Sequence, residues 1–91
     1  MPKFVIERNM PGAGSMPAED LRAAARKSNE VLNSLVPRVQ WQHSYVTGDK
    51  VYCIYIADDE GVVREHARLS GFPCNAISSV VSLIDPTTGE G

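Results

Sequence analysis

The sequence lacks the features that mark a nucleic-acid-binding or membrane protein. Its nine Lys and Arg residues are outnumbered by eleven Asp and Glu residues, and the formal net charge is −2. Because binding to a phosphate backbone requires a clustered basic surface, we expect no nucleic-acid partner. No apolar run approaches the roughly 20 residues that cross a bilayer, and no polybasic segment is present, so we expect no membrane contact.

Cysteine is scarce, and targeting signals are missing. The first residues, "MPKFVIERNMPG", alternate in polarity and have no continuous apolar core of the kind found in signal peptides. We therefore expect a cytoplasmic protein. The two cysteines, Cys53 and Cys74, do not form a C-x-x-C pair, which excludes a zinc-ribbon or thioredoxin motif. In a reducing compartment we expect them to stay free thiols.

The 91 residues predict a single α+β domain over residues 1–91, with an ordered core over 3–86 and a polar tail over 87–91. Period-2 and period-3.6 patterns alternate along the chain. They predict strands over 3–8, 39–46, 51–57 and 76–85, and amphipathic helices over 18–36 and from a cap at Asp58 and Asp59 to about Ser70.

The order strand, helix, strand, strand, helix, strand is the split βαβ, or ferredoxin-like, arrangement. We therefore expect a two-layer βαββαβ sandwich. Both helices cover one face of a four-stranded antiparallel sheet, and the other face is left open.

The segment "VQWQHSYVTGDKVYCIYIA", residues 39–57, predicts a hairpin around a Gly-Asp turn. Regular pairing places Cys53 and Tyr55 on one face. The opposite face then carries an aromatic and apolar set: Trp41, His43, Tyr45, Tyr52, Ile54 and Ile56. A β-bulge would change this assignment. If this face is the open one, we expect it to be covered in a homodimer or by a small-molecule ligand.

Four residues carry the types of side chain that bind a borderline metal such as nickel, zinc or copper: Glu7, His43, Cys53 and His66. Their spacing matches neither H-E-x-x-H nor paired C-x-x-C motifs. Each also has an ordinary structural interpretation, as a surface charge, a cross-strand histidine, a buried cysteine or a helix histidine at the edge of the core. The residues alone leave both interpretations open.

Catalysis is less well supported than binding. A nucleophilic pair of Cys53 and His66 is conceivable, but no helix N-terminus or second cysteine activates Cys53. The alternative is an enzyme or small-molecule binder of the dimeric α/β-barrel kind, in which the open sheet faces enclose a pocket and His43 acts as acid or base. The adjacent Glu7 and Arg8 are interpreted as a surface or edge ion pair.

Several segments in order, "FVIER", "WQHSYV", "YCIY", "REHARLSGFP" and "LIDP", resemble a family of small bacterial proteins. The family includes an actinobacterial nickel-binding, nickel-responsive protein with a ferredoxin-like fold that forms dimers. The resemblance implies a homodimer, nickel binding and a role in nickel sequestration or response, and it implies no known reaction.

With the resemblance added, we expect a surface or interfacial metal site built on His43, with Glu7 on a nearby strand of the same sheet. A second cluster would pair Cys53 with His66. Because His43 and Cys53 lie on opposite faces of a regular hairpin, one site that uses both is not expected without a bulge or a partner chain.

Overall fold

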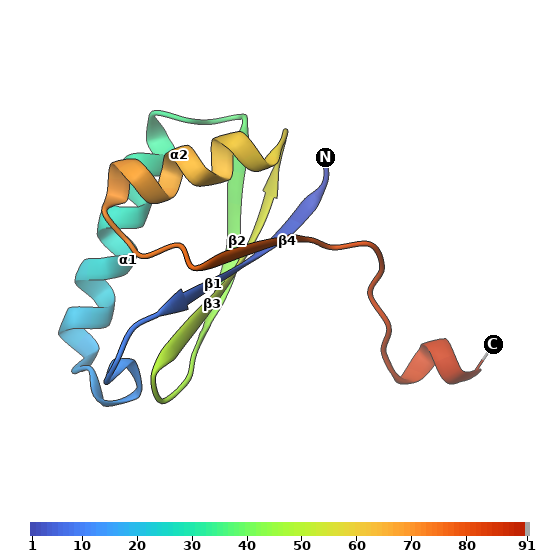
Figure 1. The fold of residues 1–91 in the computed structure, drawn as a ribbon, viewed down its shortest axis with the longest axis horizontal. Helices are drawn as coiled ribbons and strands as arrows, with labels where there is room; N and C mark the ends of the chain where they lie inside the picture. The colour runs from blue at the N-terminus through green and yellow to red at the C-terminus, as the bar shows by residue number, and fades with distance from the viewer. Residues whose placement is uncertain (91) are drawn as a thin grey trace.

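The computed structural model describes residues 1–90 and confirms the ferredoxin-like fold (Figure 1). Four strands alternate with two helices in the predicted order. In chain order the elements are β1 (Lys3–Asn9), the 3-10 turn η1 (Ala13–Ser15), α1 (Ala18–Asn33), β2 (Val39–Val46), β3 (Lys50–Ala57), α2 (Glu60–Ser70), β4 (Ala76–Ser79) and the 3-10 turn η2 (Pro86–Glu90).

The strands form one antiparallel sheet in the order β2-β3-β1-β4. The hairpin pairs Val46 with Val51, and His43 opposes Ile54, as the turn signal predicted. Between Trp41 and His43 the register shifts, so that Trp41 opposes Tyr55. This bulge adds one residue to β2 and turns Trp41 to the face opposite His43. The prediction that Trp41 shares a face with His43 and Tyr45 was therefore wrong.

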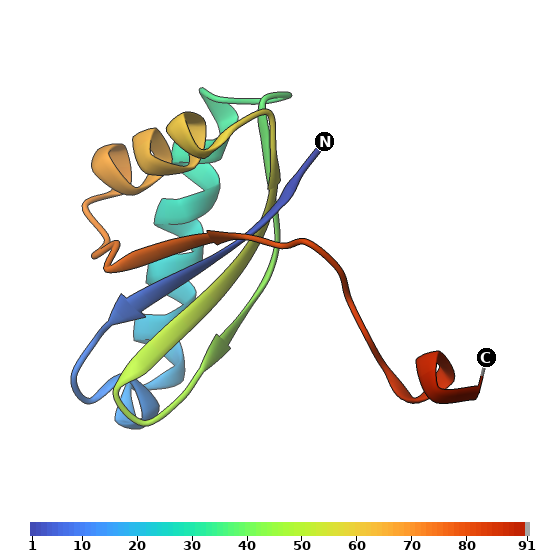
Figure 2. The ribbon, with the colours of Figure 1, turned by 45° about the vertical axis from the view of Figure 1, so that its right-hand side comes forward.

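Both helices lie against the same face of the sheet, as predicted (Figures 1 and 2). α2 begins where the Asp59 side chain accepts a hydrogen bond from the backbone N–H of Val62 at 2.9 Å. It ends at Gly71, which adopts the left-handed conformation with a φ of 76°. α1 buries Ser28, Val31 and Leu32 toward the sheet.

Alternate residues of the central strands, β1 and β3, point toward the helices and are buried. On β3 the buried positions are Val51, Cys53, Tyr55 and Ala57, while the residues between them are half-buried on the open face. Regular alternation therefore made the β3 pattern predictable from sequence. On β1 the same alternation buries Phe4, Ile6 and, unexpectedly, Arg8.

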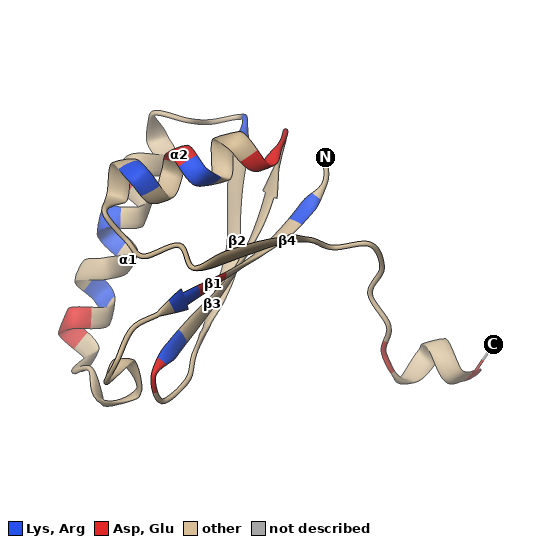
Figure 3. Ribbon diagram, in the orientation of Figure 1, with Lys and Arg blue, Asp and Glu red and all other residues tan. Residues whose placement is uncertain are grey.

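The last strand is shorter than predicted. β4 ends at Ser79, and the Val80 N–H still donates a hydrogen bond to the Lys3 carbonyl at 2.8 Å. Residues 81–85, which we expected to continue the strand, leave the sheet as an extended arm that points away from the body (Figures 1 and 2). No charged residue occurs between Ala76 and Ile84 (Figure 3), so the arm is apolar along most of its length. Of the predicted tail over 87–91, residues up to Glu90 belong to η2, and Gly91 lies outside the described residues. None of the helices within residues 1–90 has the length and apolar character that a membrane crossing requires.

Candidate functional site

His43 lies on the open face of the sheet and is exposed to solvent. Its ring contacts the Tyr45 ring edge-on, with 5.1 Å between centroids and 77° between planes. The two side chains line a shallow hollow of about 290 Å³, whose other walls come from β1, β3 and the start of the C-terminal arm. An accessible imidazole in such a hollow can bind a metal ion or a small organic ligand.

Glu7 shares the open face with His43, as predicted, but it already has a partner. Its carboxylate accepts a hydrogen bond from Lys50 Nζ at 2.6 Å and a longer one from the Tyr52 hydroxyl at 3.4 Å. The bond and charge of Lys50 lower the pKa of Glu7, against a small opposing effect of burial. Strand β3 lies between the strands that carry Glu7 and His43. The ion pair between Glu7 and Lys50 would have to break before Glu7 could bind a metal.

Cys53 lies on the covered face of the sheet, and His66 lies on α2, which packs over that face next to Tyr55; both side chains are buried. Cys53 Sγ accepts a hydrogen bond from Arg8 Nε at 3.4 Å. His66 Nε2 lies 3.2 Å from Ser28 Oγ, and its Nδ1 is buried without a hydrogen-bond partner among residues 1–90. Burial lowers the pKa of His66, the charge of Arg8 lowers it further, and the bond with Ser28 opposes both. The imidazole is therefore neutral at pH 7.

The sheet thus divides the four predicted ligands into two pairs, Glu7 with His43 and Cys53 with His66. Nowhere in residues 1–90 do three side chains of His, Cys, Asp or Glu come together in a way that could hold a metal ion. The buried pair also fits a metal cation poorly, because the guanidinium of Arg8 lies beside Cys53 and repels positive charge. The exposed His43 is the better candidate ligand, and one chain supplies too few ligands to complete a site around it.

Arg8 is the residue that sequence reasoning missed. It is only 2% exposed, so the interpretation as half of a surface ion pair with Glu7 was wrong. Its guanidinium donates hydrogen bonds to Cys53 Sγ at 3.4 Å, to the Pro73 carbonyl at 2.6 Å and to the Tyr55 hydroxyl at 3.3 Å. The alternation of Phe4, Ile6 and Arg8 was the signal, since residues two apart in a strand share a face.

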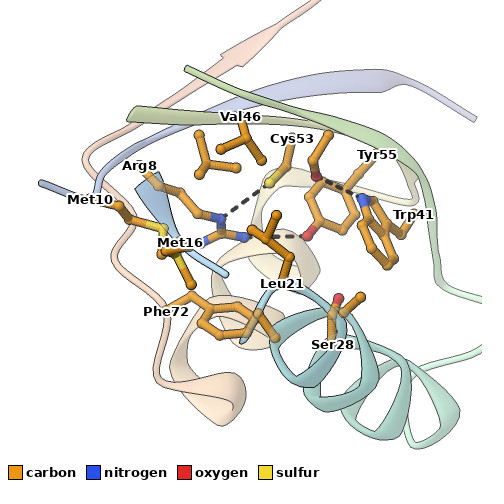
Figure 4. A pocket seen from close by; sticks show the side chains of 14 residues that line it. Arg8, Met10, Met16, Leu21, Ser28, Trp41, Val46, Cys53, Tyr55 and Phe72 are labelled. Carbon is orange, nitrogen blue, oxygen red and sulfur yellow. Dashed lines mark hydrogen bonds between the residues drawn. The ribbon is translucent and has the colours of Figure 1, made fainter. Parts of the chain in front are cut away.

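Arg8 lies in a pocket between α1 and the sheet, which we call the Arg8 pocket (Figure 4). The pocket has a volume of about 240 Å³ and almost entirely apolar walls. Figure 4 shows the guanidinium inside it, with Cys53 and Tyr55 on one side and Met10 and Met16 on the other. The ring of Phe72 forms part of the wall, with its centroid 5.7 Å from the Arg8 Cζ atom.

None of the groups that accept hydrogen bonds from Arg8 is a carboxylate. Burial raises the pKa of Tyr55 to about 12, with a further contribution from Cys53 that Arg8 opposes, so the phenol stays protonated. The Pro73 carbonyl is neutral. The four ion pairs among residues 1–90 all use other cations, namely Arg38, Lys50, Arg64 and Arg68.

The comparisons with known proteins agree with this fold. The model of a family described as "Nickel responsive protein SCO4226-like" matches residues 4–80. The crystal structure of SCO4226 from Streptomyces coelicolor A3(2) superposes with a TM-score of 0.76 over 90% of this chain and 99% of that chain, at 15% identity. Curated proteins gave no match. At that identity the crystal structure supports the fold, while the family match covers most of the sequence. The resemblance in the sequence is confirmed, and the chain belongs to the SCO4226-like family of nickel-responsive proteins.

Proposed function

We propose that the protein binds Ni²⁺ on the open face of its sheet through His43 and that two copies of the chain together complete the site. The observation that carries this proposal is the exposure of His43 in a member of a nickel-responsive family. The other histidine, His66, is fully buried beside the charge of Arg8. His43 is therefore the imidazole that can meet a metal ion from solvent.

The chemistry of the open face suits such a metal. Neutral imidazole is a good ligand for nickel, zinc and copper, and water or carboxylate can fill further positions. One chain offers a single imidazole here, so a second copy is the simplest source of another. Glu7 could contribute only if Lys50 releases it. Zinc and copper would compete with nickel at the same ligands, so selectivity has to come from geometry and metal supply.

The proposed homodimer forms through the open face. Half-buried Val5, Ile54 and Ile56 on this face continue into the exposed apolar arm, in which Val81 is 98% exposed and Ile84 is 78% exposed. A contiguous apolar surface of this kind is typical of a protein interface. We propose that the faces of two copies pack together and that each arm lies on the partner. The bound nickel would serve sequestration or nickel response.

Calorimetric titration of untagged protein with Ni²⁺ tests this function. We expect wild-type protein to bind nickel and His43→Gln to bind it at least tenfold more weakly. Gln40→Ala, on the same face of the same strand, is the matched control and should bind like wild type. Affinity should fall as the pH decreases from about 8 to about 5.5, because protons compete with the metal for imidazole. Equal nickel affinity in wild type and His43→Gln would refute the proposed site.

The hollow beside His43 supports a second candidate, a small organic ligand held between the two sheet faces. The hollow contains Tyr45 and Ile54 as apolar walls and His43 as the group that could act as acid or base. Protein that takes up no nickel in the same titration would favour this candidate, and screening of small molecules against wild type and His43→Gln would then follow.

A further inference from the structure

We propose that the Arg8 pocket binds a small monocarboxylate with an apolar body, whose carboxylate pairs with the Arg8 guanidinium. The pocket lies on the helix-covered side of the sheet, away from the open face that carries His43. The proposal therefore does not depend on nickel binding, and the two can fail separately.

The buried positive charge of Arg8 favours an anionic ligand. A guanidinium keeps its proton at every physiological pH, and a buried cation is normally paired with an anion. Arg8 is 2% exposed, yet no carboxylate is among its partners, which are a cysteine sulfur, a backbone carbonyl and a protonated phenol. None of the ion pairs within residues 1–90 includes Arg8. A bound anion would supply a negative charge to pair with the Arg8 guanidinium.

The Arg8 guanidinium also has unused hydrogen-bond donors. A guanidinium has five N–H groups, of which three have partners among residues 1–90, at Cys53, Tyr55 and Pro73. One N–H on each terminal nitrogen is left over. A carboxylate has two oxygens that accept hydrogen bonds, and arginine often binds such a group through two donors. A neutral alcohol of the same shape has one acceptor oxygen and no negative charge, so it would gain the apolar contacts and at most a weaker hydrogen bond.

The size and apolar lining of the rest of the pocket favour a ligand with an apolar body. Beyond Arg8 the walls include apolar side chains from the segment before α1, from α1 itself, from β2 and from the loop after α2: Met16, Leu21, Ala24, Trp41 and Phe72. The volume of about 240 Å³ exceeds the roughly 150 Å³ of an engineered apolar cavity that binds benzene. An aromatic ring with a short chain ending in carboxylate fits both the volume and the single buried cation.

Binding can be tested with 3-phenylpropionate as the probe and 3-phenylpropan-1-ol as its neutral counterpart. Trp41 is the only tryptophan of the chain and lines the pocket, so its fluorescence reports occupancy. We expect wild-type protein to bind the acid at least tenfold more tightly than the alcohol. Equal binding of acid and alcohol, or no binding of the acid at millimolar concentration, would overturn the proposal.

Two variants locate the site. Arg8→Met should lose the preference for the acid while it still binds the alcohol. Ala25→Phe, which keeps Arg8 but fills the pocket from α1, should bind neither molecule, and it gives a test if Arg8→Met does not fold. His43→Gln should bind the acid like wild type, which separates this site from the nickel site. Retention of acid binding in Ala25→Phe would place the ligand elsewhere and contradict the proposal.

Discussion

At the scale of single residues, the environment of His66 has a consequence for stability. The side chain is fully buried, with the Tyr55 ring at 5.3 Å between centroids and the cation of Arg8 nearby. Burial and Arg8 lower its pKa in the folded state, so the unfolded chain binds a proton more readily than the folded one. The folded state therefore loses stability when the imidazole has to be protonated.

We predict that the free energy of unfolding decreases as the pH falls below about 6.5, the ordinary pKa of a histidine side chain. The decrease should continue until the pH reaches the lowered pKa of His66 in the folded state. One proton contributes a slope of at most about 1.4 kcal/mol per pH unit. Urea unfolding between about pH 7.5 and about pH 5 measures this slope. The slope should persist in His43→Gln and flatten in His66→Gln. A wild-type curve that is flat over this range would contradict the account of His66.

Arg8 and Trp41 show where residue-level prediction from sequence stops. The strand pattern places Arg8 on the face of Phe4 and Ile6, but the rule that arginine is rarely buried favours a surface position. The partners that keep Arg8 inside, Cys53, Tyr55 and Pro73, are at least 45 residues away in sequence. Local patterns do not contain contacts over such distances. The face of Trp41 was predicted wrongly because the bulge between Trp41 and His43 leaves no signal in the sequence of β2.

At the scale of the elements, α2 was predictable because both of its ends have specific residues. The sequence indicated a cap at Asp58 and Asp59 and an end at Gly71. In the structure Asp59 caps the first turn, and Gly71 ends the helix in a left-handed conformation. The end of β4 was not predictable, since the apolar residues after Ser79 have the composition of a strand, but β1 begins at Lys3, which pairs with Val80, and offers no residue for the positions beyond it. Strand formation depends on pairing as well as on propensity.

The cap of α2 gives a prediction at this scale. Asp59→Ala removes the acceptor for the Val62 N–H and should lower the free energy of unfolding by about 1 kcal/mol. Asp58→Ala is the matched control, because the neighbouring carboxylate makes only an exposed ion pair with Arg38 at 3.6 Å. That control should change stability by less than about 0.5 kcal/mol. Chemical denaturation of the three proteins measures both values. Equal losses in the two variants would argue against the cap.

At the scale of the whole molecule, the two faces of the sheet separate two sets of chemical groups. The covered face holds Arg8 and Cys53 and packs against His66 of α2, while the open face holds Glu7 and His43. The sequence predicted this division for His43 and Cys53 from strand alternation alone. It did not predict the pocket, because a cavity depends on how α1 packs against the sheet.

The arm supplies a prediction about assembly. If the arm of each chain packs on its partner, the double variant Leu83→Glu with Ile84→Glu should shift the protein from dimer to monomer in sedimentation equilibrium. Both side chains are exposed apolar groups of the arm, and burying two carboxylates in an interface is unfavourable. Leu69→Glu, an exposed leucine on α2, is the control and should leave the assembly unchanged. A dimer of unchanged affinity in the arm variant would exclude the arm from the interface.

The most direct test of the central claim is native mass spectrometry of untagged protein prepared with added nickel. We predict that nickel is carried by a species of two chains and is lost, at the same protein concentration, in His43→Gln. Cys53→Ser should retain the metal, since Cys53 lies on the covered face beside Arg8. Nickel bound to a single chain, or nickel retained in His43→Gln, would contradict a shared site on the open face.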